Sequence, residues 1–191
     1  MATSKKDQLV EVALGLFCRE GFHATGIDKI LAEANVAKMT LYKHFSSKDE
    51  LILATLRLRD QQFNDNLMQN VERLMAEKYQ QQPLGVVHAL FDSIEEWIRG
   101  DSFYGCTFIN ASAEFSDLND PVHQIATAHK LSVKNIIHAL ITPLQLNSPD
   151  YLAQQISLLI DGAIVVAQTT GNKDSINLAR NAAITLCEGA S

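Results

Sequence analysis

The segment from Lys38 to Lys48 carries lysine, threonine, tyrosine and histidine side chains at a spacing that suits binding of a polyanion. If Leu41 and Phe45 point inward one helical turn apart, the positions facing away from them form an outward stripe. That stripe consists of Lys38, Met39, Tyr42 and Lys43. Lysine and threonine reach base edges or phosphate, and tyrosine and histidine donate hydrogen bonds to phosphate oxygens. The pattern favours a short helix that reads duplex DNA, although a helix that is merely solvated would show the same periodicity.

The elements around this segment form a helix-turn-helix pattern. An apolar stripe predicts a first helix that ends at Gly21, a residue suited to the left-handed position just past a helix. Thr25 lies three residues before Asp28 and is expected to open a second helix that ends at Asn35. A third helix of about two turns is expected over residues 38–44. The second and third helices are therefore joined by only a few residues.

Helical signals continue through the rest of the chain, while strand signals are nearly absent. Ser47 and Glu50 form a capping-box pattern, so a fourth helix is expected to begin near Lys48, run to about Gln80, and point its free N–H groups at the DNA backbone. Further helices are expected between Pro83 and Gly100, within residues 105–115, from Pro121 to about Leu140, from Pro149 to near Gly171, and from about Asp174 to Glu188. The sequence predicts an all-α protein with about nine helices.

The charge is unevenly distributed along the 191 residues. Residues 1–48 carry seven bases and five acids, which gives them a net charge of +2. Because the whole chain has a net charge of −6, the other 143 residues carry −8. A mildly basic end on an acidic body fits a chain in which only one end meets a polyanion. The sequence predicts a DNA-binding domain over residues 1–47 and a helical body over residues 48–191.

Several classes of protein and site find no support in the sequence. No apolar run approaches the roughly 18 residues of a membrane span, and the amino-terminal residues lack the apolar region of a secretory signal, so we expect a cytoplasmic protein and no membrane partner. Cys18, Cys106 and Cys187 are far apart without a C-x-x-C pair, which argues against a disulfide framework and a zinc site. The histidines show no H-E-x-x-H motif, and no recognisable catalytic motif occurs. We expect no metal, no cofactor and no enzyme activity.

Residues 21–51, GFHATGIDKILAEANVAKMTLYKHFSSKDEL, closely resemble the amino-terminal signature of the TetR-type (tetracycline-repressor-like) transcriptional regulators. The shared pattern is a Gly-Phe/Tyr turn, a threonine before the second helix, a small-residue turn, Lys-x-Thr-Leu-Tyr-x-His-Phe, and then Lys-x-x-Leu. Two positions depart from it, because Asn35 replaces the usual turn glycine and Met39 replaces a small residue. The resemblance covers about 45 residues and fixes turn, core and contact positions together.

The resemblance implies roles for matching positions only. Thr25, Tyr42, His44 and Lys48 would contact phosphates, while Lys38 and Thr40 would reach base edges. Outside the matching positions, Met39 is expected to contact a thymine methyl group, and Lys43 shares the outward stripe. The implied partner is double-stranded DNA with a palindromic operator.

The resemblance also implies a homodimer and a small-molecule effector. The last two helices would pair with their copies in a four-helix bundle, because one short recognition helix supplies too few contacts and paired half-sites need two. The candidate dimer residues are Leu152, Ile156, Leu159, Ala163, Val166, Ile176, Ala179 and Ala183. The candidate effector-pocket residues are Phe63, His88, Phe91, Trp97, Tyr104, Cys106 and Phe108.

The predicted function is repression by a homodimer that leaves its operator when an effector binds. Cys106 follows Gly105 at an expected helix start, where peptide dipoles favour a thiolate, so thiol modification is a second route to release, and a buried, inert cysteine is the alternative. Three other possibilities stay open: a constitutive DNA-binding protein without an effector, an all-α enzyme, and an activator in place of a repressor.

Overall fold

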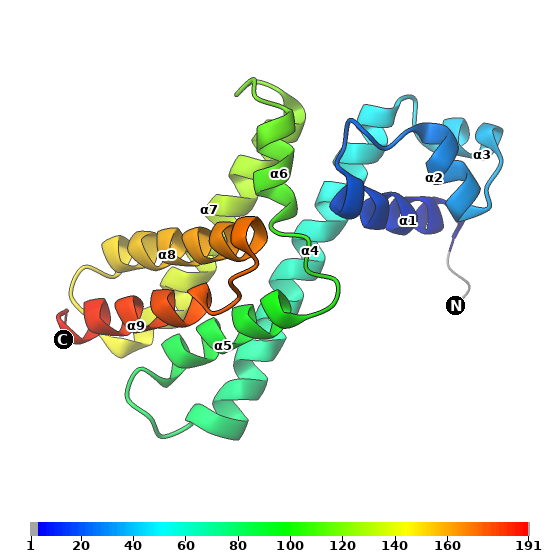
Figure 1. Ribbon diagram of the computed structural model, residues 1–191. Helices are drawn as coiled ribbons and strands as arrows, with labels where there is room; N and C mark the ends of the chain where they lie inside the picture. The colour runs from blue at the N-terminus through cyan, green and yellow to red at the C-terminus, as the bar shows by residue number, and fades with distance from the viewer. Residues whose placement is uncertain (1–3, 191) are drawn as a thin grey trace. The chain divides into compact units, whose positions relative to one another are not determined.

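The structure, a computed structural model, describes residues 4–190, and these residues form nine α-helices without a β-strand (Figure 1). The helices are α1 Lys5–Glu20, α2 Ile27–Ala34, α3 Lys38–His44, α4 Lys48–Leu74, α5 Gly85–Arg99, α6 Thr107–Glu114, α7 Pro121–Ile141, α8 Pro149–Thr170 and α9 Ser175–Glu188. A π-helical turn, η1 (Met75–Tyr79), continues α4, and a short 3-10 turn, η2 (Thr142–Leu144), follows α7. The all-α prediction is confirmed.

Most helix ends lie where the local sequence signals place them. Gly21 follows α1 with φ +89°, and its N–H donates to the carbonyl of Phe17. Gly171 follows α8 in the left-handed conformation. The start of α2 differs from the expectation, because Gly26 and not Thr25 holds the N-cap position and no side chain caps the helix. The fourth helix also differs, since its α-helical part ends at Leu74 and only the π-helical turn carries it to Tyr79.

The chain divides into two compact units. The first unit comprises the residues up to Gln62 together with Thr107–His129, and the second comprises Phe63–Cys106 and the residues from Lys130 onward. This division follows packing, so α6 and the start of α7 belong with the three amino-terminal helices. The boundary at residue 47 separates the chain by role, and it stays a prediction.

The core of the first unit forms where the apolar stripes of α1, α2 and α3 meet. Leu9, Phe17, Ile30 and Leu41 are almost completely buried there, and Phe22 from the turn after α1 stacks on Phe17 with ring centroids 5.1 Å apart. Burial of side chains of this size stabilises the fold by roughly 1.5–3 kcal/mol each. This packing fixes the inward side of α3 and so decides which of its residues face solvent.

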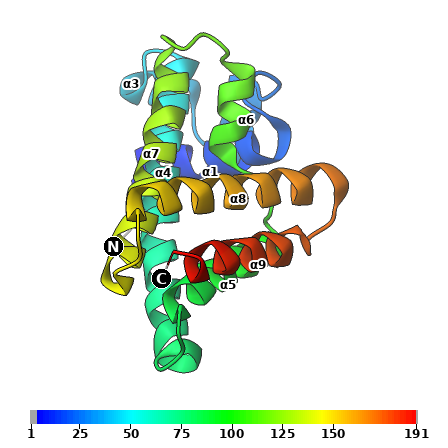
Figure 2. The same ribbon diagram turned by 90° about the vertical axis from the view of Figure 1, so that its left-hand side faces the viewer.

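In the second unit, α8 and α9 lie side by side, and α5 packs against α9 (Figure 2). Ile156 and Ile160 of α8 and Ile176 and Ala183 of α9 are buried between these helices and their neighbours. The apolar faces expected from the sequence are therefore largely covered within one chain.

Candidate nucleic-acid interface

Helix α3 presents its polar side to solvent, as its sequence pattern predicts. Leu41 and Phe45 are 0% and 4% exposed, whereas Met39 is 86% exposed and Tyr42 is 51% exposed. Lys38, Lys43 and His44 are also exposed, and Thr40 is half-buried. A seven-residue helix with this outward side gains little from burial, so its outward residue types are free to suit a ligand.

The turn between α2 and α3 explains why asparagine replaces the usual glycine. Asn35 has φ 49° and ψ 51°, which is the left-handed region that asparagine tolerates better than other residues with a side chain. The Asn35 N–H donates to the carbonyl of Ala32, and the Val36 N–H donates to the carbonyl of Leu31. These bonds satisfy carbonyls at the end of α2 and set the short connection to α3.

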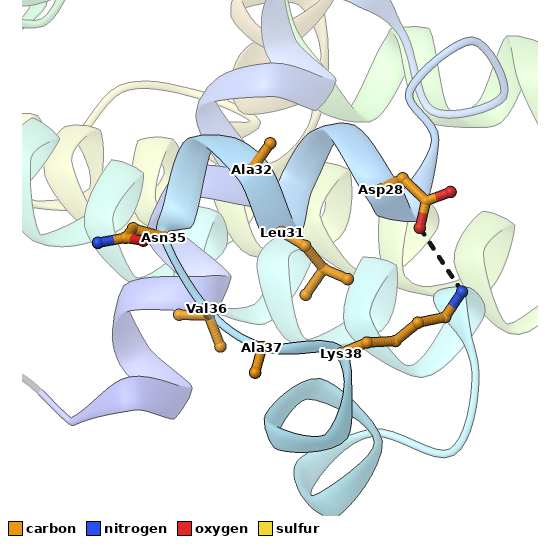
Figure 3. A pocket seen from close by; sticks show the side chains of 7 residues that line it. All are labelled: Asp28, Leu31, Ala32, Asn35, Val36, Ala37 and Lys38. Atoms are coloured by element: carbon orange, nitrogen blue, oxygen red, sulfur yellow. Dashed lines mark ion pairs between the residues drawn. The ribbon is translucent and has the colours of Figure 1, made fainter.

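A surface pocket of about 440 Å³ lies between α2 and the start of α3. Figure 3 shows Asp28 and Lys38 pointing toward each other across it. The Lys38 Nζ atom is 3.6 Å from Asp28 Oδ1, and both side chains are largely exposed. The surface presented by α3 therefore includes a carboxylate directly beside the lysine that was expected to reach base edges.

The amino-terminal end of α4 is capped by reciprocal hydrogen bonds. The Glu50 N–H donates to the Ser47 hydroxyl over 3.2 Å, and the Ser46 N–H donates to Glu50 Oε2 over 2.7 Å. The backbone hydrogen bond from Ser46 lowers the pKa of the Glu50 carboxyl below its ordinary value. Lys48, at the first position of α4, donates to the carbonyl of His23 over 3.3 Å. The lysine is thus held at the helix end whose free N–H groups favour an anion.

Thr25 departs from its expected role. Its side chain is fully buried, and its hydroxyl donates to the carbonyl of Gly21 over 2.7 Å. The hydroxyl therefore closes the turn before α2 and is not offered to a phosphate.

The predicted effector-pocket residues do not form one group. Phe63 and Trp97 pack edge to face with centroids 5.6 Å apart, and Trp97 makes a similar contact with Phe103 at 5.2 Å. Phe91 is fully buried in the core, whereas Tyr104 is 41% exposed. Of the predicted set, Phe63 and Trp97 are therefore in contact within the second unit, and Phe103, which was not in that set, joins them.

The remaining candidates lie elsewhere. His88 stacks on Tyr79 with ring centroids 5.5 Å apart. Cys106 is 5% exposed and directly precedes α6. Phe108 belongs to the first unit, where it stacks on the buried His129 at 3.7 Å. These residues take part in separate contacts, so the assignment of an effector pocket stays a prediction.

Most of the predicted dimer residues are buried within the chain. The buried ones are Leu152, Ile156, Ala163, Ile176, Ala179 and Ala183. Leu159 is half-buried and Val166 is 40% exposed. The sequence pattern identified the apolar stripes, but a single chain covers them because α8 and α9 pack against each other.

A different set of apolar side chains on α8 remains exposed. Tyr151, Leu158 and Val165 follow one another at seven-residue spacing and are 63%, 72% and 38% exposed. We call these three residues the α8 stripe. Leu178 of α9 is 70% exposed. Among the described residues, α8 is also the one helix that is long and apolar enough to cross a membrane by length and composition, with 39% of its apolar window buried.

Two functional candidates were not apparent in the sequence. The carboxylate of Glu114 in α6 accepts hydrogen bonds from the backbone of the turn before α2. Arg180 of α9 lies between two carboxylates of α5. Both contacts join residues far apart in the chain, so no local pattern could have identified them.

Comparison with known proteins agrees with this geometry. Residues 9–55 match the family described as bacterial regulatory proteins, tetR family. The crystal structure of a TetR-family transcriptional regulator from Streptomyces coelicolor is 30% identical, with a TM-score of 0.83 over 98% of this chain and 96% of that one. The HTH-type transcriptional regulator YjdC of Escherichia coli is 23% identical over 84% of this chain and 81% of its own length. The HTH-type transcriptional activator FasR of Mycolicibacterium smegmatis is 39% identical over 50% of this chain and 43% of its own length.

The match in sequence covers the helices that carry the candidate interface, and the structural match extends over nearly the whole chain. The family consists of regulatory proteins and not of enzymes, in agreement with the absence of a catalytic motif. The chain belongs to the TetR family of bacterial transcriptional regulators.

Proposed function

We propose that the protein is a homodimeric transcriptional repressor that binds a palindromic operator through α3 and leaves it when a small molecule binds the body. The observation that carries the proposal is the exposed side of α3, where Lys38, Met39, Tyr42 and Lys43 face solvent on a helix held from behind by Leu41 and Phe45. Lys38, Met39 and Thr40 are assigned to base edges, and Tyr42, Lys43, His44 and Lys48 to phosphates.

Two copies are needed because a helix of two turns reaches only a few base pairs. In a two-fold dimer, the two α3 helices would enter successive major grooves about 34 Å apart, so the operator would contain two inverted half-sites. Footprinting on a duplex selected by the protein from a random-sequence pool tests this arrangement. Protection of two inverted half-sites about one helical turn apart is expected, and protection of a single undivided site would contradict it.

The α8 stripe and Leu178 support a dimer built on the outward sides of α8 and α9. Exposed leucines are common singly, but three apolar side chains repeated every seven residues mark one continuous helix side. At Gly162, on the same side of α8, no atom other than those of the adjoining residues and of the helix's own backbone lies within 4 Å of the position that a Cβ would occupy. The helix surface is therefore open there for close approach by a partner helix.

The dimer surface is tested by charge substitution. Leu158→Glu would place a carboxylate in the interface and is expected to give a monomer in sedimentation equilibrium. Leu118→Glu is the matched control, because Leu118 is equally exposed but lies outside α8 and α9. If both variants have the same mass as the unaltered protein, the interface is not at the α8 stripe.

The aromatic contact of Phe63, Trp97 and Phe103 supports an effector site in the second unit. An effector releases DNA only if it binds the DNA-free state more tightly than the bound state. Screening metabolite mixtures for release of the selected duplex, with Trp97 fluorescence as a second readout, tests this part. A protein that never releases its operator would instead be a constitutive DNA-binding protein.

A further inference from the structure

The turn between α1 and α2 is held by a carboxylate from α6, within the same compact unit. Glu114 Oε1 accepts a hydrogen bond from the Phe22 N–H over 2.9 Å, and Glu114 Oε2 accepts one from the His23 N–H over 2.6 Å. These two amides lie between helices and have no helical partner of their own. One side chain thus satisfies two consecutive backbone donors with charge-assisted bonds, which are stronger than neutral ones.

The fit around this carboxylate is close. Gly21 has φ +89°, and a Cβ at this position would lie 2.9 Å from Glu114 Oε1. The ring of Phe115, next to Glu114, lies 4.7 Å from the ring of His23 and 6.1 Å from that of Phe22. The His23 Nε2 atom is also 3.1 Å from the carbonyl oxygen of Glu114. The end of α6 therefore contacts the turn through its carboxylate, its backbone and a ring.

The same turn reaches the proposed DNA contacts. His23 receives the Glu114 carboxylate at its N–H, and its carbonyl accepts the hydrogen bond from Lys48. The turn then runs through Thr25, whose hydroxyl closes it onto Gly21, and directly into α2. A change at Glu114 would therefore alter both the position of Lys48 and the start of the helix-turn-helix.

We propose that Glu114 is a positioning residue for DNA recognition, which holds the turn before α2 in the geometry that the operator requires. This inference rests on the proposed function, since it assumes that α3 and Lys48 contact DNA. Glu114 does not touch DNA in this proposal and acts through the backbone of Phe22 and His23. Helix α6 thereby gains control over operator affinity, because any displacement of its last turn would withdraw the carboxylate.

The direction in which a charge-neutralising substitution changes DNA affinity shows whether Glu114 positions the turn or acts only through its charge. Glu114→Gln removes a negative charge, which by itself would strengthen binding to a polyanion. If Glu114 positions the turn, the same substitution weakens binding, because the NH2 group that replaces one carboxylate oxygen is a donor and cannot accept the hydrogen bond from the N–H that faces it. Glu33→Gln is the matched control, since Glu33 is an exposed carboxylate of α2 that forms an ion pair with the exposed Arg19.

The experiment measures affinity for a duplex selected from a random-sequence pool, together with hydrogen exchange of the Phe22 and His23 amides in the full-length protein. Glu114→Gln is expected to accelerate exchange at both amides and to weaken duplex binding about tenfold relative to Glu33→Gln. Glu114→Asp keeps the charge but shortens the side chain, so it is expected to weaken binding as well. This variant replaces Glu114→Gln in the experiment if Glu114→Gln does not fold.

Two outcomes would overturn the inference. In the first, the amides exchange faster but both Glu114 variants bind the duplex as tightly as Glu33→Gln. In the second, exchange at Phe22 and His23 is unchanged, which means that the carboxylate does not hold these amides. If the unaltered protein selects no duplex, the proposed function fails instead, and the exchange measurement still decides whether Glu114 holds the turn.

Discussion

The Nη2 atom of Arg180 in α9 lies 2.7 Å from Oδ1 of Asp92 in α5. The same nitrogen lies 2.6 Å from Oε2 of Glu95, one turn farther along α5. Burial alone would raise the pKa of the Glu95 carboxyl, but hydrogen bonds from Arg99 and Arg180 lower it below its ordinary value. The guanidinium thus joins α5 to α9 through two carboxylates that are largely withdrawn from water.

Removal of Arg180 should destabilise the second unit strongly. Arg180 and Asp92 are only 18% and 11% exposed, so Arg180→Met would remove the shared guanidinium from two poorly solvated carboxylates. Asp92 would keep Lys78 and Glu95 would keep Arg99, so we expect a cost of about 2 kcal/mol. Urea unfolding at a fixed protomer concentration measures this loss. Arg99→Met is the control, because Arg99 bridges Glu95 and Asp174 at the surface and its removal should cost much less. Equal losses for the two variants would show that the burial of Arg180 contributes nothing.

Tyr79 should ionise far later than an ordinary tyrosine. Burial and the hydrogen bond from its hydroxyl to Asp92, 2.7 Å long, raise the pKa of Tyr79 to about 12. Because the folded state holds this proton more tightly than the unfolded state, the contribution of Tyr79 to stability is complete below about pH 10. It is then lost as the pH rises toward 12.

An absorbance titration checks this prediction. Of the four tyrosines, one should ionise only near pH 12, and Tyr79→Phe should remove that late step. The same substitution should flatten the loss of stability between about pH 10 and pH 12. A late step that persists in Tyr79→Phe would assign the raised pKa to another tyrosine.

Lys48→Ala should weaken binding to every duplex by a similar factor, because a phosphate contact carries no direct sequence information. The slope of the logarithm of affinity against the logarithm of salt concentration should fall by about one per protomer. Lys134→Ala removes the same charge from α7, in the second unit, and should leave the slope nearly unchanged. Identical slopes for the two variants would remove Lys48 from the proposed interface.

Asp28→Asn should have the opposite effect on affinity. The substitution removes a carboxylate from the surface that α3 presents and releases Lys38 from the ion pair. We expect severalfold tighter binding to a random-sequence duplex and a smaller gain on the selected duplex, so the specificity ratio should fall. An increase of the same size on both duplexes would show that Asp28 contributes only charge.

Much of the first unit could be predicted from the sequence because its signals are local. A cap, a left-handed residue or an apolar spacing acts within a few residues of itself. Asn35 therefore marked the end of α2, and the Ser47–Glu50 pair marked the start of α4. Leu41 and Phe45, which point inward, decided which side of α3 faces solvent. The local signal failed at Thr25, because a threonine near a helix start can also turn back to the preceding carbonyl, as its bond to Gly21 does.

The dimer residues could not be assigned in the same way. Helical periodicity shows that Ile156 and Ile176 lie on apolar stripes, but it does not show whether the same chain or a second copy covers them. In the tertiary structure α8 and α9 bury these residues against their own neighbours, which leaves Leu158 and Leu178 outside.

The sequence by itself determined the helices, their order and the residues that α3 turns toward solvent, because each follows from interactions between residues a few positions apart. Only the tertiary structure decided what holds those helices in place. Glu114 is 92 positions from Phe22, and Arg180 is 85 positions from Glu95. Contacts of this kind depend on how whole helices pack. The local sequence around a carboxylate or a guanidinium on a helix surface does not predict which residue it will pair with.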